Sequence, residues 1–162
     1  MPPHRLSKET MTCCNILLVE DSPTDATILM AAFRSIGYSG QIHIVQDGVE
    51  AITFLEQIVL DDSLNLPQLI LLDLNLPRKS GHEMLHDLKT NPQWQCIPAI
   101  VFSSSSRDID IGKSYQLHAN AYIAKPIVFE DYRLTVQRIH DFWLETAQLQ
   151  TTGLPQRLIV GV

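Results

Sequence analysis

The stretch LILLDLNLPRKSG, from Leu69 to Gly81, decides the fold. Its first four residues are all apolar, which is typical of a short strand that is buried on both faces of a parallel sheet. Asp73 follows this run directly, and a helix with apolar residues at helical spacing is expected to begin at Gly81. The stretch therefore predicts a buried strand that places one carboxylate at the edge of a sheet.

The same alternation of strand and helix continues on both sides of this stretch. Short apolar runs predict further strands at 16–19, 42–45, 97–102 and 121–124. Helices are expected from about residue 23 to Gly37, over 49–58 and 109–117, and from Phe129 onward. Ser22 or Thr24 can cap the first of these helices, with Pro23 in its first turn. Five strands alternating with five helices predict a doubly wound α/β domain with right-handed connections.

Length and charge limit the classes of protein to consider. The chain has 162 residues, enough for one well-filled core but not for two full domains. A formal net charge of -6 disfavours a broad electrostatic contact with nucleic acid or with an anionic membrane. Its three cysteines have no disulfide or metal-ligand spacing, and no apolar run resembles a signal peptide or a membrane span. We expect a soluble cytoplasmic protein whose partners are proteins and cations.

The ends of the chain differ in character from its middle. Residues 1–14 are expected to form a mobile leader, 15–149 the folded domain and 150–162 a tail. The tail contains Leu158 to Val160, a β-prone run that could join a sheet edge or stay disordered. It is not basic, so a DNA-binding domain is not expected after the folded part.

Residues that carry chemistry follow the predicted strands. In an open parallel sheet the loops after the carboxyl ends of the strands face one crevice. The residues that come there are Glu20, Asp21, Asp73, Ser103 and Lys125. Each alone is more simply explained as a helix cap or a surface residue. Together, three crowded carboxylates would raise one another's pKa unless a cation kept them ionised, and an all-oxygen ligand set favours Mg²⁺ or Mn²⁺ over zinc.

These parts suit the transfer of a phosphoryl group to the protein itself. Asp73 ends the central apolar strand and is the best candidate for the nucleophile, which would make the product an acyl phosphate. The expected metal ligands are Glu20, Asp21, Asp73 itself and the backbone carbonyl of Asn75. Lys125 and Ser103 are expected to contact the phosphate. We expect a phosphoacceptor that catalyses only its own phosphorylation and dephosphorylation, not an enzyme with a separate substrate.

Four motifs together resemble the receiver domains of two-component response regulators, over about Asn15 to about Glu145. They are LLVEDSPTD, LILLDLNLPRKSG, IPAIVFSSS and ANAYIAKPI. The resemblance implies a sheet with strand order 2-1-3-4-5 and a histidine kinase that phosphorylates Asp73. It also implies that Glu20 and Asp21 bind Mg²⁺, that Lys125 contacts the phosphate, and that a cis peptide bond precedes Pro126.

The resemblance also implies a switch. In the family, a hydroxyl at the position of Ser103 moves to the phosphate and an aromatic residue at the position of Tyr122 turns inward behind it. The surface formed by 109–117, 121–124 and the helix from Phe129 then changes. Four serines follow one another from Ser103, so Ser104 is an alternative for the hydroxyl, although the spacing from Asp73 and Lys125 favours Ser103.

The last predicted helix carries two apolar stripes. One contains Tyr132, Val136, Ile139 and Trp143, and the other contains Leu134 and Phe142. Only one stripe can cover the sheet, and an apolar strip left outside usually marks an interface. The segment HDFWLETAQL resembles the end of small response regulators that partner phytochrome-type histidine kinases. Homodimers on this face are frequent in that subgroup, so a homodimer through Leu134, Phe142 and Trp143 is expected, unless Phe142 and Trp143 pack under the tail.

Three other classes of protein fit the motifs less well. Dehalogenase-type phosphatases require a second acid two residues after the nucleophile, where this chain has Asn75. A flavin-binding electron carrier needs a phosphate loop after the first strand, where Glu20 and Asp21 stand instead. A receiver-like scaffold that docks without phosphorylation would be indicated by a broken set of acids and lysine, and here the set is intact.

Overall fold

The computed structural model describes residues 14–61 and 65–150. Five parallel strands form one sheet in the order β2-β1-β3-β4-β5, as predicted. The strands are β1 (Cys14–Val19), β2 (Gln41–Val45), β3 (Leu69–Leu72), β4 (Ala99–Ser103) and β5 (Ala121–Ala124). The helices are α2 (Pro23–Ser35), α3 (Gly48–Val59), α4 (Gly81–Thr90), α5 (Asp108–Gln116) and α6 (Phe129–Ile139), which the π-helical segment η1 (His140–Thr146) continues. The expectations for the leader and for Leu158 to Val160 concern residues outside this description.

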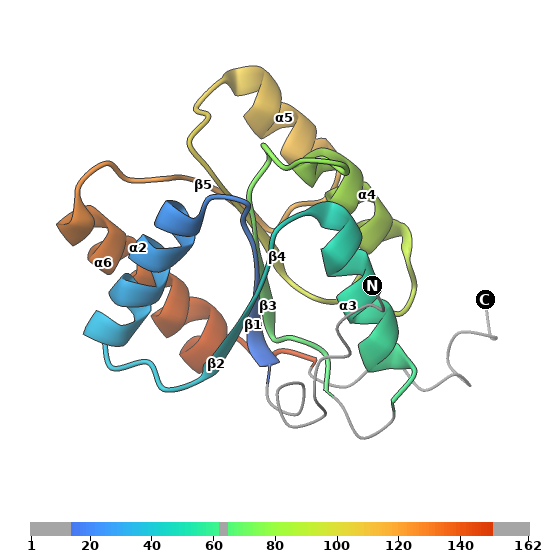
Figure 1. Cartoon of the computed structure of the whole chain (residues 1–162), viewed down its shortest axis with the longest axis horizontal. Coiled ribbons are helices and arrows are strands. Elements are labelled where there is room, and N and C mark those ends of the chain that lie inside the picture. The colour runs from blue at the N-terminus through green and yellow to red at the C-terminus, as the bar shows by residue number, and fades with distance from the viewer. Residues whose placement is uncertain (1–13, 62–64, 151–162) are drawn as a thin grey trace.

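Helices cover both faces of the sheet (Figure 1). On one face α2 and α6 lie side by side, and their apolar residues form a core with strand residues such as Leu18 and Leu71. On the other face α3 and α4 enclose a second core with Leu17 and Ile70. Side chains of a strand alternate between its two faces, so each central strand contributes to both cores. All four residues of β3 are fully buried, which confirms the prediction from the run LILL.

Polar caps start the helices that follow the first three strands. The Ser22 hydroxyl accepts the N–H of Asp25, so Ser22 rather than Thr24 caps α2, and Pro23 is its first residue. Asp47 caps α3, and Ser80 and Glu83 cap α4 reciprocally. These caps satisfy backbone donors that a helix start leaves without a partner, so each loop turns directly from strand to helix.

One strand begins later than the sequence indicated. The prediction placed a strand at 97–102, and β4 spans Ala99–Ser103. The N–H of Ile97 donates to the carbonyl of Trp94 in a turn, and Pro98 has no N–H for a ladder. The end of the strand is correspondingly one residue later, which places Ser103 within β4 at its carboxyl end.

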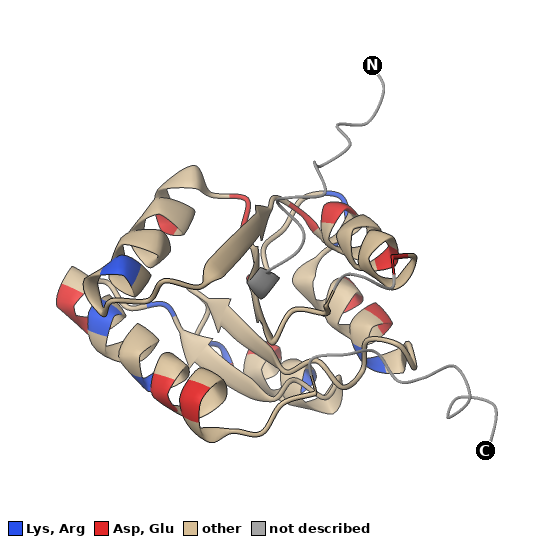
Figure 2. Cartoon of the chain, turned by 90° about the horizontal axis from the view of Figure 1, so that it is seen from below, with Lys and Arg blue, Asp and Glu red and all other residues tan. Residues whose placement is uncertain are grey.

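Most of the charged residues of the described chain lie on the helices. Figure 2 shows basic and acidic segments interspersed around the molecule rather than gathered into one basic face. Within the described part of the chain, no helix is both long enough and apolar enough to cross a bilayer.

The loop between Asp73 and α4 is held by close backbone contacts. The N–H of Gly81 donates to the carbonyl of Leu74 at 3.0 Å. A Cβ at position 81 would overlap the carbonyl oxygen of Asp73 and lie 2.6 Å from the Cα of Leu74. Arg78 has a left-handed backbone with φ of 60°, and its guanidinium pairs with buried Asp47 at 2.5 Å. The loop that follows the candidate nucleophile is thus tied to α4 and to the start of α3.

Replacing Gly81 with alanine is therefore expected to destabilise the fold. The added methyl group has to push the backbone of Asp73 and Leu74 aside, at a cost of about 2 to 3 kcal/mol in the free energy of unfolding. Gly112 on α5 is the matched control, because a Cβ there meets nothing within 4 Å. Gly112→Ala should leave stability unchanged or raise it by up to about 1 kcal/mol. Urea denaturation of both variants checks this, and equal effects would contradict it.

Candidate metal and phosphoryl site

The carboxylates that follow β1 and β3 meet at one edge of the sheet. The N–H of Asp73 donates to the carbonyl of Val19 at 3.0 Å, which places the end of β3 beside the end of β1. Oxygen atoms of Glu20, Asp21 and Asp73 lie within 4.8 Å of one another. Glu20 and Asp73 are buried and Asp21 is exposed. The structure thus brings together the three acids that the sequence indicated.

Lys125 neutralises part of this negative charge. Its backbone N–H donates to the carbonyl of Ser103 at 2.8 Å, which fixes it at the end of β5. Its Nζ donates to Glu20 Oε2 at 2.6 Å, to Asp25 Oδ2 at 2.8 Å and to Asp73 Oδ2 at 2.9 Å. Burial alone would lower the pKa of Lys125, but the hydrogen bonds to these carboxylates outweigh it and hold the pKa well above its ordinary value. The lysine is therefore a fixed positive charge.

The negative charge is nevertheless not fully balanced. Burial raises the pKa of Glu20, and the hydrogen bond from Lys125 offsets this effect only in part. A further cation would favour the ionised form of this carboxylate. The available ligand atoms are all oxygen, which suits Mg²⁺ or Mn²⁺. The residues present therefore fit a hard divalent ion.

Asp25 belongs to this cluster and was missed by the sequence analysis. It stands in the first turn of α2, where an acid is ordinarily explained by its interaction with the helix N-terminus. The signal that could have found it is its place in LLVEDSPTD, one turn after the acid pair and at the end of α2 that faces the crevice.

The other predicted site residues surround Asp73 less directly. The N–H of Asn75 donates to Asp73 Oδ1 at 3.3 Å. Ser103 is fully buried, and its hydroxyl accepts the N–H of Ser105 at 3.2 Å, whereas Ser104 is exposed. Tyr122 is half-buried, and its hydroxyl donates to the carbonyl of Ser105 at 2.8 Å. Ser103 therefore contacts the N–H of Ser105, and Tyr122 contacts its carbonyl.

The predicted cis peptide bond before Pro126 is wrong. The Lys125–Pro126 bond is trans, like the other peptide bonds of the described residues. The trans isomer is intrinsically favoured even before proline. Lys125 also reaches its three carboxylates with its backbone paired to β4, so the contacts of the site form with the favoured isomer.

The strand order and the residues at the strand ends are those of a receiver domain. The chain belongs to the response regulator receiver domain family, whose sequence model matches residues 16–137.

Two curated relatives cover most of the chain. The response regulator Rcp1 of Synechocystis is 40% identical over 134 residues, which are 83% of this chain and 91% of Rcp1. FilR2 of Methanothrix harundinacea, a probable methanogenesis regulatory protein, is 39% identical over 129 residues, covering 80% of this chain and 83% of FilR2.

Solved structures agree with this relationship. The Mn²⁺-bound form of Rcp1 matches with a TM-score of 0.74 at 40% identity, over 83% of this chain and 97% of that chain. The phosphorylated cyanobacterial phytochrome response regulator RcpA matches with a TM-score of 0.75 at 40% identity, over 83% and 96% of the two chains.

The contacts of Lys125 predict a large effect of its removal. Lys125→Met should lower the free energy of unfolding of the metal-free protein by about 3 to 5 kcal/mol, because Glu20 and Asp73 are left buried without their cation. Millimolar Mg²⁺ should restore part of that loss. Lys79→Met is the control, since Lys79 pairs with Asp87 at the surface and such pairs contribute at most about 1 kcal/mol. Denaturant titrations with and without Mg²⁺ measure both, and a small, Mg²⁺-independent loss for Lys125→Met would refute the assignment.

Proposed function

We propose that this response regulator accepts a phosphoryl group on Asp73 from a histidine kinase. The observation that carries the proposal is the position of this carboxylate. It is buried at the carboxyl end of the central strand, within 4.8 Å of two further acids and 2.9 Å from the ammonium of Lys125. The phosphorylated form known for RcpA supports the same chemistry in a relative.

The transfer follows from these contacts. An oxygen of Asp73 attacks the phosphorus of a phosphohistidine, the P–N bond breaks with its electron pair returning to the imidazole, and an aspartyl phosphate forms. Lys125 donates to an oxygen of the incoming group, and the Ser103 hydroxyl binds a second one. Hydrolysis of the same acyl phosphate returns the free carboxylate, so the only reactions we assign to the protein are its own phosphorylation and dephosphorylation.

A divalent cation completes the proposed site. Glu20, Asp21, Asp73 and the backbone carbonyl of Asn75 would hold Mg²⁺ or Mn²⁺, which supplies positive charge against the phosphoryl oxygens. The Mn²⁺-bound form of Rcp1 supports this choice of ion.

The contacts of Ser105 suggest how phosphorylation reaches the surface. The N–H of Ser105 donates to the Ser103 hydroxyl, and the carbonyl of Ser105 accepts from the Tyr122 hydroxyl. The Ser105 hydroxyl donates to Asp110 on α5 at 2.5 Å. When Ser103 turns to the phosphoryl group, it releases the N–H of Ser105. We propose that the loop and α5 then shift, that Tyr122 turns inward, and that the surface of α5, β5 and α6 changes.

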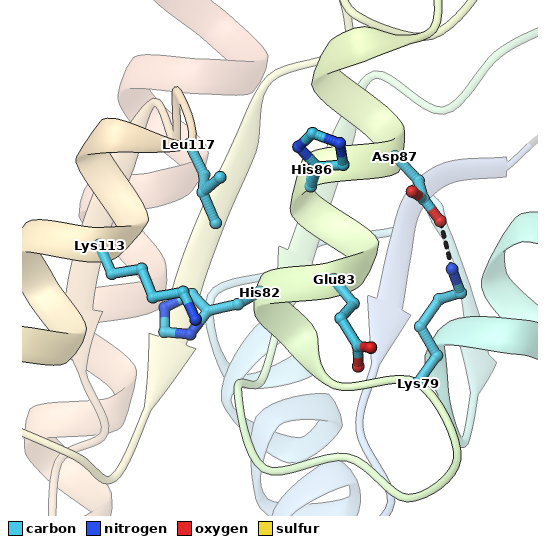
Figure 3. A pocket seen from close by; sticks show the side chains of 7 residues that line it. All are labelled: Lys79, His82, Glu83, His86, Asp87, Lys113 and Leu117. Carbon is cyan, nitrogen blue, oxygen red and sulfur yellow. Dashed lines mark hydrogen bonds and ion pairs between the residues drawn. The ribbon is translucent and has the colours of Figure 1, made fainter.

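The packing of α5 favours such a shift. Ser114 is the one buried residue of this helix, and no side chain caps its start. A hollow of about 300 Å³ separates it from α4 (Figure 3), lined by Lys79, His82, Glu83, His86, Asp87, Lys113 and Leu117. A polar contact of 3.0 Å between His82 and Ser114 spans the two helices. Few apolar contacts have to break when α5 moves.

The kinase is proposed to dock beside the acids. A hollow of about 400 Å³ between α2 and β2 begins at Glu20 and Asp21 and is lined further by Pro23, Ala26, Thr27, Met30, Arg34, Ile44 and Gln46. Apolar side chains such as Ala26, Met30 and Ile44 lie there among polar ones, and a mixed surface of this kind beside the acids suits the segment of a kinase that carries a phosphohistidine. The relationship to RcpA favours a phytochrome-type kinase, and the ATP that such kinases use makes the cytoplasm the compartment we propose.

A homodimer through α6 and η1 is the second part of the proposal. Tyr132, Val136 and Ile139 are buried, whereas Leu134 is 41% exposed and Phe142 is 53% exposed. Trp143 is half-buried, and its ring packs edge-on against that of Phe142. These two aromatic residues line a hollow of about 360 Å³ together with Ile123, Thr135, Arg138 and Ile139. This largely apolar surface suits a second copy of the chain. The net charge of -6 disfavours a nucleic acid as its partner.

Incubation with acetyl phosphate and Mg²⁺ tests the phosphoacceptor. Wild type should gain the mass of one phosphoryl group, and Asp73→Asn should gain none, because the amide cannot form the acyl phosphate. A chelator should suppress the adduct on wild type. Intact-mass spectrometry provides the readout, and an unmodified wild type, or an adduct on Asp73→Asn, rules out the proposed role of Asp73.

Sedimentation equilibrium tests the dimer. Phe142→Ala should weaken dimerisation roughly tenfold or more, because aromatic anchors dominate interfaces of this kind. Leu60→Ala is the control, since Leu60 is an exposed apolar residue at the end of α3, away from the hollow and from the surface of α5, β5 and α6. The dimer would be disproved if wild type stayed monomeric at high micromolar concentration both with and without the phosphoryl group.

A further inference from the structure

All three hydrogen-bond donors of the Lys125 ammonium are in use. A protonated lysine offers three N–H groups, and here Glu20, Asp25 and Asp73 take one each, at 2.6, 2.8 and 2.9 Å. To donate to a phosphoryl oxygen, Lys125 has to release one of these carboxylates.

Burial distinguishes the three partners. The side chains of Glu20 and Asp73 are 3% and 7% exposed, and that of Asp25 is 35% exposed. A released Glu20 would remain buried without its cation, which is costly. The same holds for Asp73 while the phosphoryl group approaches, because Asp73 is still an ionised carboxylate until the new P–O bond forms. A released Asp25 can be hydrated, and it stays near the N-terminus of α2, which favours a negative charge. Asp25 is therefore the partner whose loss costs least.

We propose that Asp25 is a positioning residue that holds the Lys125 ammonium in the unphosphorylated protein and competes with the phosphoryl group for it. This inference rests on the proposed phosphorylation of Asp73. Its second consequence is electrostatic, since the carboxylate of Asp25 adds negative charge at the place where an anionic group has to enter. Both effects favour the unphosphorylated state, so Asp25 sets how readily the site is phosphorylated.

Two measurements on Asp25→Asn test this. Beryllofluoride becomes tetrahedral when it binds the carboxylate of an aspartate, and it then resembles a bound phosphoryl group. Its affinity in the presence of Mg²⁺ should rise roughly threefold to tenfold, as expected for an ion pair that is partly exposed to water. The rate of phosphorylation by acetyl phosphate should rise by a similar factor. Affinity for Mg²⁺ alone should not rise, because the variant removes a negative charge and leaves Lys125 to Glu20 and Asp73. A purely structural role would not strengthen anion binding while sparing metal binding.

Controls separate this inference from the proposed function. Glu56→Gln removes one charge from an exposed position on α3 and should leave all three quantities unchanged. If wild type binds no beryllofluoride and accepts no phosphate, the proposed function fails. Two results would overturn only the role of Asp25 while wild type binds beryllofluoride and accepts phosphate. In the first, the affinities and the rate of Asp25→Asn equal those of wild type. In the second, Glu56→Gln shows the same increases as Asp25→Asn. Asp25→Ala is the second variant should the asparagine variant fold poorly, and the same increase is expected of it.

Discussion

The rest of the structure depends on one lysine ammonium shared among carboxylates. Two of these acids, Glu20 and Asp73, are buried, and burying ionised carboxylates is costly unless a positive charge accompanies them. Lys125 supplies that charge from the end of β5, a strand that is not adjacent to β3 because β4 lies between them. Its side chain must therefore extend past the end of β4, which ends in the small residue Ser103. The register of three neighbouring strands is thereby tied to the charge balance of the site.

The two flanks of Asp73 differ in how firmly they are held. On one flank, Gly81 packs against the backbone of Asp73 and Leu74, and the pair of Arg78 with Asp47 fixes the loop to α3. On the other flank, polar contacts through Ser105 connect the site to α5. A change of charge at Asp73 is therefore transmitted more easily toward α5 than toward α3. This asymmetry gives the proposed switch its direction.

The sequence was sufficient for the features that depend on strand order. Each apolar run stops where a chemically active residue begins, so Glu20, Asp21, Asp73 and Lys125 could be placed at one edge once the sheet was taken to be parallel. Ser103 was also located correctly, although the start of its strand was set by a turn at Trp94 that the apolar pattern does not reveal. The role of Asp25 could not be read in this way. Its contact depends on the direction of a side chain 100 residues away, and its position has a sufficient local explanation as a helix-start acid. The isomer before Pro126 was inferred from resemblance alone, and no local feature of the sequence determines it.

The thin packing of α5 has a consequence for the internal motions of the molecule. Backbone amides exchange with solvent through openings whose free energy reflects the contacts that must be broken. The amides of β1, β3 and β4 lie between two cores, so they open only when most of the structure unfolds. A helix with Ser114 as its one buried residue can open alone, while the sheet stays closed. We therefore expect the helix to open from the sheet part of the time even without phosphate, and the proposed modification at Asp73 would have only to change how often it does so.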